Sequence, residues 1–166
     1  MTDDRHGLLQ RLHQPRLWAG SIGRSGAQLS AGDLDLSGLD LSGRDLNGIE
    51  APGGRFAGTT LARTDLSGSN LASAELAGVD LTGAQLDKAN LDDANLSGAR
   101  LAGANLRRAS LLQVDLRGAV LDGADLRGAY LSDAVLIGAS LAGAALEGAI
   151  LDAAPPAPKG TGSQPL

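Results

Sequence analysis

A leucine recurs at every fifth residue through most of this chain. Stepping by five from Leu36 to Leu151 gives 24 positions, of which 22 are Leu, and the exceptions are Ala51 and Phe56. A small or apolar residue stands two places before most of these centres, and Gly stands two places after 16 of the 24. So long and so regular a period leaves few folds that can bury the leucines.

Neither an α-helix nor a flat strand buries a five-residue pattern. In a helix each leucine is rotated by about 140° from the last, so the leucines spread around the whole cylinder. In a strand an odd step places successive leucines on opposite faces. A chain that turns a corner every five residues instead directs each centre, and the residue two before it, to the inside. Gly after the centre tolerates a positive φ at the corner, and stacking of coils covers leucines that no single unit buries.

The units A-N-L-S-G at 94–98 and A-D-L-R-G at 124–128 show the detailed pattern. This A-(D/N)-L-x-x pattern, which continues over residues 34–153, resembles the pentapeptide-repeat family. The resemblance implies an all-β fold, a right-handed quadrilateral β-helix with four pentapeptides in each of about six coils. Four sides place residues twenty apart above one another, so Asn70 lies over Asn90. That pair is either an amide ladder or two solvated side chains.

Three segments are expected along the chain. Residues 29–153 form the β-helix, and residues 1–28 form a cap segment that contains a short helix with Leu8, Leu9 and Leu12 on one face. We interpret this helix as a cover for the first coil; a helix that binds a partner is the alternative. Residues 154–166 are rich in Pro and Gly and are expected to be a disordered tail.

Two inward positions depart from the pattern. Arg44 stands where a small apolar residue is expected, so we predict that its side chain bends out to solvent or pairs with a carboxylate. Phe56 replaces Leu close to Gly54, and we predict that its ring fills the volume that this glycine leaves.

Composition narrows the class of protein. The chain has 19 acidic and 14 basic residues, a net charge of −5, which argues against a general nucleic-acid binder. It has no Cys, which excludes disulfides and thiolate chemistry. No apolar run approaches the roughly 18 residues of a membrane span, and Met1–Arg5 lacks the charged-then-apolar pattern of a signal peptide. A cytoplasmic protein with no membrane partner is expected.

No catalytic constellation is apparent in the sequence. His6 and His13 both precede the repeats, with no nucleophile beside them. The Asp92-Asp93 pair is expected to be solvated rather than to hold a cation. We therefore predict a protein that is not an enzyme and that has no cofactor, no metal and no direct contact with nucleic acid.

Two functions are compatible with the rod and its charge. Residues 33–152 hold 17 acidic and nine basic side chains. The favoured hypothesis is a non-catalytic, rigid scaffold that binds another protein. The resemblance implies the alternative, because some family members imitate duplex DNA and inhibit DNA gyrase or topoisomerase IV or protect them from quinolones. The candidate acidic surface for such a partner is Asp35, Asp40, Asp45, Glu50, Asp115 and Asp125.

The outward positions become apolar near the end of the repeats. The residues concerned are Val120, Tyr130, Val135, Ile137 and Ile150. An apolar rim at an end that nothing caps predicts a homodimer through the C-terminal coils. The alternative is a tail that folds back over this end.

Overall fold

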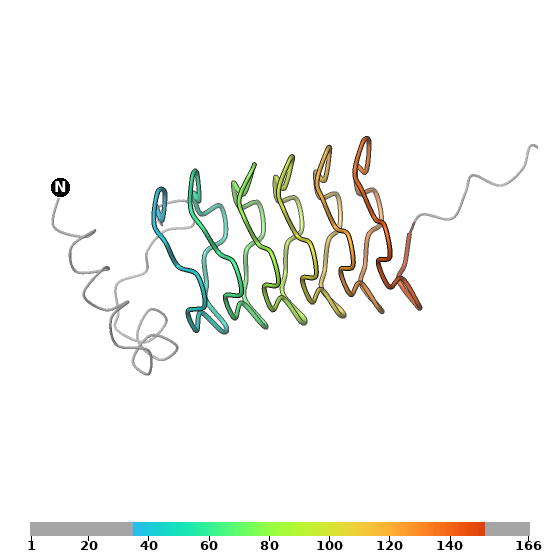
Figure 1. Cartoon of the computed structure of the whole chain (residues 1–166), viewed down its shortest axis with the longest axis horizontal. Helices are drawn as coiled ribbons and strands as arrows, with labels where there is room; N and C mark the ends of the chain where they lie inside the picture. Colours follow the sequence, from blue (N-terminus) through green and yellow to red (C-terminus); the bar gives the residue numbers. More distant parts are fainter. Residues whose placement is uncertain (1–34, 152–166) are drawn as a thin grey trace, which may run out of the picture.

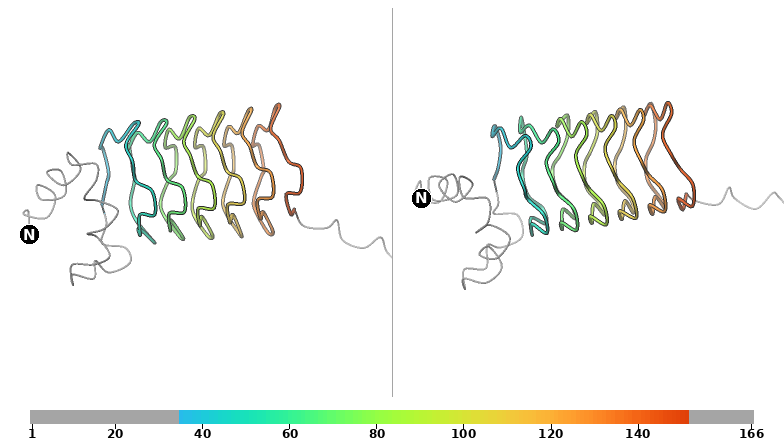
Figure 2. Two further views of the ribbon diagram at one scale, coloured as in Figure 1. Left: turned by 90° about the horizontal axis from the view of Figure 1, so that it is seen from below. Right: turned by 60° about the horizontal axis from the view of Figure 1, so that its bottom comes forward.

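The computed structural model of the chain describes residues 35–151, which wind into a rod of stacked coils (Figures 1 and 2). Asp35 lies at one end of the rod and Leu151 at the other. The five-residue register runs through this whole range without an insertion, as predicted. The predicted cap over residues 1–28 and the tail over residues 154–166 lie outside the described residues.

Single-residue parallel bridges hold neighbouring coils together. Every fifth residue bridges to the residue twenty places later, from the pair Asp35–Arg55 to the pair Tyr130–Ile150. Within residues 35–151 there is no helix, and no strand extends beyond one bridge residue. The resemblance to the pentapeptide-repeat family predicted an all-β quadrilateral coil. Extended strands do not form because every pentapeptide contains a turn. Only one residue of each pentapeptide therefore forms a bridge to the neighbouring coil.

All five backbone N–H groups of the pentapeptide at residues 64–68 donate hydrogen bonds. The second, third and fifth donate to carbonyls of the neighbouring coils, at 2.9, 2.7 and 2.9 Å. The first closes the preceding turn. The fourth, that of Ser67, donates to Oδ1 of Asp65 at 2.9 Å. Buried backbone groups need such partners, and here the coil ladder, the turn and one side chain supply them.

The corners are turns whose third residue has a positive φ, the geometry of a type II turn. At Gly98 this φ is +65°, and at Arg63, a non-glycine at an equivalent corner, it is +57°. Six other non-glycine residues share this conformation: Ser73, Lys88, Asp93, Arg108, Gln113 and Asp133. Residues with a side chain adopt it at a cost in backbone strain, which explains why Gly predominates there.

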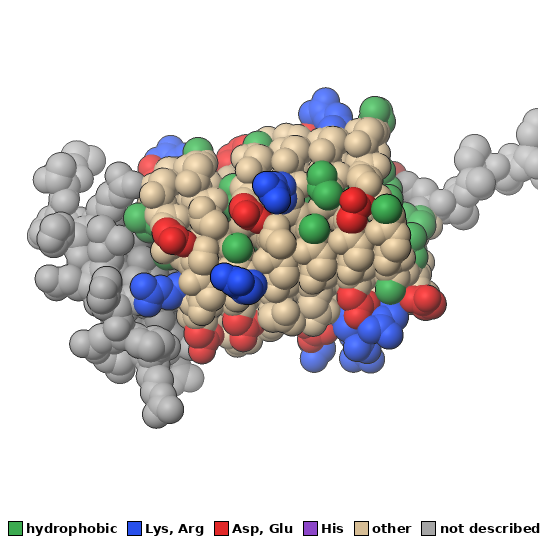
Figure 3. Space-filling view, in the orientation of Figure 1, with side chains coloured by type: hydrophobic (Ala, Val, Ile, Leu, Met, Phe, Trp, Pro, Cys, Tyr) green, Lys and Arg blue, Asp and Glu red, His purple; other side chains and the backbone are tan. Residues whose placement is uncertain are grey.

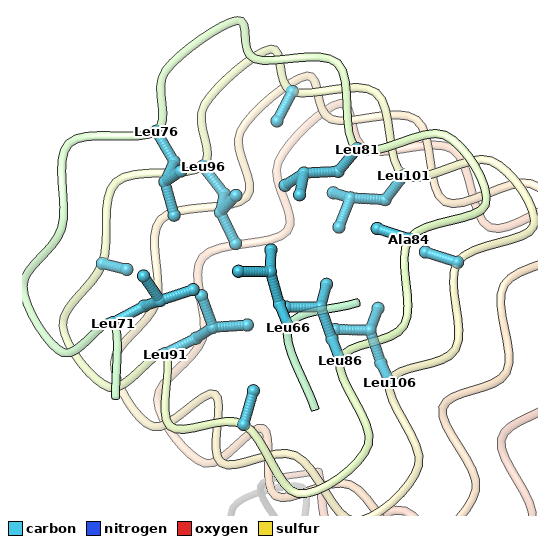
Figure 4. Close-up of a cluster of buried hydrophobic side chains, with 14 of the residues drawn as sticks. Leu66, Leu71, Leu76, Leu81, Ala84, Leu86, Leu91, Leu96, Leu101 and Leu106 are labelled. Atoms are coloured by element: carbon cyan, nitrogen blue, oxygen red, sulfur yellow. The ribbon is translucent and has the colours of Figure 1, made fainter. Parts of the chain in front are cut away.

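The core is the stack of inward leucines, as predicted. Leu66, Leu86 and Leu106 lie above one another in successive coils, and each is fully buried (Figure 4). The small residue two places before each centre, such as Ala84, fills the space between the leucine columns. Each leucine is therefore packed against those of the coils before and after it, so the stack rather than any one unit is stable.

The irregular inward positions behave as predicted. The Arg44 side chain is exposed, so its charge stays in water. Phe56 is fully buried, and its ring lies against Gly54: a Cβ added there would be 3.1 Å from a ring carbon. Nearby, the buried hydroxyl of Thr64 donates to the carbonyl oxygen of Leu41 at 2.9 Å. The buried Oγ of Ser69 has no hydrogen-bond partner in the described part of the chain.

Candidate interaction surfaces

The predicted acidic residues are distributed around the rod rather than gathered on one side. Asp35 and Asp115 belong to one bridge column, and Asp45 and Asp125 belong to another. Asp40 and Glu50 lie in the two remaining columns. Asp35, Asp40, Asp45 and Glu50 are all exposed and form an acidic ring around the first coil. Asp115 and Asp125 lie four coils away from it.

Arginine neutralises half of the predicted acidic set. Asp35 is 3.4 Å from the guanidinium of Arg55, which stands above it in the same column. Arg127 binds both carboxylate oxygens of Asp125, through Nε at 2.8 Å and Nη2 at 2.5 Å, and the pair Arg117–Asp115 has the same geometry. These hydrogen bonds lower the pKa of Asp125 to about 2. Acidic and basic side chains alternate across the face in Figure 3 rather than forming one large area of a single sign.

Many of the acidic side chains also serve the backbone. The carboxylates of Asp40 and Asp45 accept hydrogen bonds from the N–H groups two residues later, at 3.0 and 3.1 Å. Asn70 does the same through Oδ1, and its amide nitrogen donates to Glu50 at 2.9 Å. The column of Asn70 and Asn90 is therefore present, but the hydrogen bonds of Asn70 go to Glu50 and to the backbone rather than into an amide ladder.

The predicted dimer end is an exposed apolar surface. Tyr130, Val135, Ile137 and Ile150 are 46, 37, 75 and 49% exposed, and Val120 is half-buried. Hydrophobic side chains are grouped at this end of the rod in Figure 3. The candidate residues did not include the core leucines at this end: the last two centres, Leu146 and Leu151, are 36 and 46% exposed because no coil among the described residues stacks beyond them.

The described residues contain neither a cluster of metal ligands nor a membrane-spanning helix. No three His, Cys, Asp or Glu side chains between residues 35 and 151 are grouped as metal ligands. The same range contains no helix that is long and apolar enough to cross a membrane.

The repeat pattern can now be compared with known proteins. A family model described as pentapeptide repeats matches residues 55–86, 84–123 and 115–152. This chain is a pentapeptide-repeat protein. The five-residue repeat of this family accounts for the recurrence of the central Leu, of the Gly at the turn and of the Asp or Asn that precedes the Leu. Among curated proteins, none matches the chain.

Solved structures of other pentapeptide-repeat proteins are similar to this one. The protein Rfr23 from the cyanobacterium Cyanothece 51142 is 29% identical, with a TM-score of 0.62, over 71% of this chain and 91% of its own. A protein of the Arabidopsis thaliana thylakoid lumen is 34% identical over 65% of each chain, with a TM-score of 0.42. QnrB1, a plasmid-mediated fluoroquinolone resistance protein, is 19% identical over 71% of this chain and 80% of its own, with a TM-score of 0.33.

Proposed function

We propose that this pentapeptide-repeat protein is a non-catalytic binding rod that engages another protein through its C-terminal coil, and that one such partner is a second copy of itself. The observation that carries the proposal is the group of exposed apolar side chains near this end of the rod, namely Tyr130, Val135, Ile137 and Ile150 together with Leu146 and Leu151. Exposed apolar side chains that are grouped at one end of a protein are typical of an interaction site.

The outward apolar residues occupy positions that elsewhere stabilise the backbone. Val135 and Asp115 share a column, and Asp115 caps the N–H of Arg117 at 3.0 Å. Val135 has no side-chain acceptor, so the equivalent N–H of Ile137 loses this cap. In another column Asn90 caps the N–H of Asp92 at 2.9 Å, whereas Ile150, three coils later, has no side-chain acceptor. These coils therefore carry apolar surface where a polar side chain would stabilise the isolated rod better, which favours a role in binding.

Within the described residues, the end of the rod also has backbone N–H groups without ladder partners. The N–H of Leu116 donates to the next coil at 2.9 Å, but those of Leu136 and Leu141 have no ladder partner within residues 35–151. Exposed leucines, with backbone donors that no described residue pairs, make a surface that a partner can cover. A second copy related by a two-fold axis covers it with an equal surface and closes the assembly.

Light scattering across a concentration series tests this proposal. The mass of the wild-type protein is expected to rise toward twice that of the monomer, and Tyr130→Asp with Ile137→Asp is expected to remain monomeric. Ala57→Asp is the matched control, because Ala57 is exposed in the same column as Ile137 at the opposite end. A wild-type protein that stays monomeric throughout would sink the second-copy assignment.

A second candidate function rests on the acidic ring of Asp35, Asp40, Asp45 and Glu50. Its four exposed carboxylates surround the first coil, a distribution that suits a cationic surface of a partner that normally holds DNA. The test is a DNA gyrase supercoiling assay with and without a quinolone. Inhibition or protection that charge reversal at Asp40 and Asp45 weakens would support mimicry, and no effect at micromolar protein would remove it.

A further inference from the structure

Four cationic side chains gather at one corner of this otherwise acidic rod. They are Lys88, Arg107, Arg108 and Arg127, and all four are exposed. Two backbone hydrogen bonds place them together: the N–H of Lys88 donates to the carbonyl of Arg107 at 2.9 Å, and that of Arg108 to the carbonyl of Arg127 at 3.1 Å. Three successive coils therefore contribute to one corner, which we name the basic corner. Four of the nine basic residues between 35 and 151 lie in it, whereas the same range holds 15 acidic residues.

Two of these cations are left for a partner. Lys88 lies 3.6 Å from Asp87, and Arg127 is held by Asp125. Among the described residues, no carboxylate lies within salt-bridge distance of Arg107 or Arg108. The Arg108 side chain extends over the next coil, because its Cγ is 3.5 Å from where a Cβ of Gly128 would lie. Arg107 is close enough to Asp125 to help lower the pKa of that carboxyl.

Two of these cationic residues have a strained backbone conformation. Lys88 and Arg108 have φ values of 58° and 55°, in the left-handed region. The other described residues of that corner column are glycines: Gly48, Gly68, Gly128 and Gly148. Glycine adopts this conformation without strain, so Lys and Arg in two successive coils reduce the stability of the corner relative to Gly.

The surroundings of the basic corner limit the size of its ligand. Three coils span about 10 Å at the spacing of paired strands. Asp45 and Asp65 continue the same side toward the N-terminal end, and Glu147 follows toward the C-terminal end. A long polyanion such as duplex DNA would extend over these carboxylates and be repelled, whereas a short acidic segment can pair with Arg107 and Arg108 without reaching them.

We propose that the basic corner binds a short acidic segment of a partner protein, whose carboxylates pair with the guanidinium groups of Arg107 and Arg108. The contact between Arg127 and Asp125 shows the two-bond geometry that such a carboxylate takes with arginine. The inference rests on the proposed function in that the rod is a protein-binding module. It uses a different surface from the C-terminal coil.

The test uses a fluorescein-labelled peptide with a run of six Asp between Gly-Ser flanks, and measures its fluorescence anisotropy with the full-length protein at an ionic strength of about 0.1 M. The informative variant is Lys88→Gly with Arg108→Gly, because glycine relieves the left-handed strain. Its thermal stability is expected to rise, while its dissociation constant for the peptide increases at least about tenfold through the loss of charge-assisted contacts.

Arg63→Gly provides the matched control. Arg63 has a φ of 57° at an equivalent corner on another side, so this variant also loses one positive charge and the backbone strain. Its peptide affinity is expected to stay within about twofold of wild type, since charges separated by more than about 10 Å are largely screened at moderate salt. Equal weakening by Arg63→Gly, or none by the double variant, would show that the basic corner does not bind the peptide.

Two further outcomes bear on the assignment. If wild-type protein does not bind the peptide, or binds a single-stranded 20-nucleotide DNA more tightly through the same residues, the acidic-protein assignment is wrong. Light scattering of the double variant separates this inference from the proposed function: its mass is expected to follow that of the wild type, whatever the peptide result.

Discussion

Oδ1 of Asp65 accepts a 2.9 Å hydrogen bond from the backbone N–H of Ser67, the one N–H of its pentapeptide that neither the coil ladder nor the turn uses. Equivalent bonds join Asp80 to Thr82 and Asn95 to Ser97, at 3.0 and 3.1 Å. A physical reason for Asp or Asn before the central Leu follows: both carry an acceptor at the distance that reaches this N–H, whereas Glu and Gln are one methylene longer.

Removal of this cap is expected to destabilise the rod. Asp65→Ala should lower the free energy of unfolding by about 1 kcal/mol, the usual effect of losing a side-chain cap. Asp65→Asn should retain most of the stability, because its Oδ1 accepts the same bond. Urea denaturation followed by circular dichroism measures both. Arg100→Ala, at an exposed position of the same kind, is the control and is expected to change little. Equal effects of Asp65→Ala and Arg100→Ala would contradict the capping role.

Ser69→Ala is expected to stabilise the protein. The buried Oγ of Ser69 has no partner among the described residues, and Ala89 occupies the equivalent position in the next coil. Replacing the hydroxyl with hydrogen removes a desolvation penalty of about 1 kcal/mol. Thr64→Val is the contrasting variant: it conserves shape but loses the bond to Leu41, so its midpoint of urea unfolding should fall while that of Ser69→Ala rises.

Two glycines are expected to resist substitution for different reasons. At Gly98 a Cβ meets nothing within 4 Å, so Gly98→Ala should cost only the left-handed strain, about 1 kcal/mol. At Gly54 a Cβ would lie 3.0 Å from the Ala51 carbonyl oxygen and 3.1 Å from the Phe56 ring, so Gly54→Ala should cost about 1–3 kcal/mol by overpacking.

Phe56→Leu distinguishes these two causes. Combined with Gly54→Ala it removes the ring contact, so the double variant should lose less stability than the sum of the single variants. Combined with Gly98→Ala the losses should add, because the two residues do not share a contact. Thermal unfolding of these five variants measures both couplings, and additive losses at Gly54 would refute the steric explanation.

The carboxyl of Asp125 is expected to titrate according to its arginine partner. Arg127 lowers the pKa of Asp125 from its ordinary value of 3.8 to about 2. The stabilising effect of this pair is therefore fully present above about pH 4 and is lost as the pH falls toward the lowered pKa. Arg127→Ala should raise the Asp125 pKa toward 3.8, as measured by the carboxyl carbon shift in an NMR pH titration. An unchanged pKa in this variant would mean that Arg127 is not the cause.

Part of this structure was predictable from residue spacing. The position of every buried leucine between Leu36 and Leu131 follows from the five-residue period, because only a coil with a corner in each unit buries that pattern. The exposed Arg44 and the exchange of volume between Phe56 and Gly54 were also predicted, since burial of charge and overpacking are costly at any inward position. These predictions depend only on the place of each residue within its own pentapeptide, and the stacked coils confirm them.

The candidate sites were less accessible to the same reasoning. Asp40 and Asp45 were predicted as part of a surface for a partner, but their carboxylates also accept backbone hydrogen bonds that become apparent only when the ladder is traced. The basic corner was missed because Lys88 and Arg127 are far apart in the chain. The twenty-residue length of a coil could have revealed it, because residues twenty apart lie above one another. This spacing places Lys88 beside Arg108, and Arg107 beside Arg127.

From its sequence alone, this protein was committed to a leucine-filled, cornered coil, because no helix or flat strand hides an apolar residue repeated at an interval of five. Which charges neutralise one another, which stabilise the backbone and which remain available at the surface was decided only by the stacking of coils. Electrostatic and hydrogen-bonding contacts act over a few ångströms, and it is the stacking that brings residues twenty positions apart to within that distance.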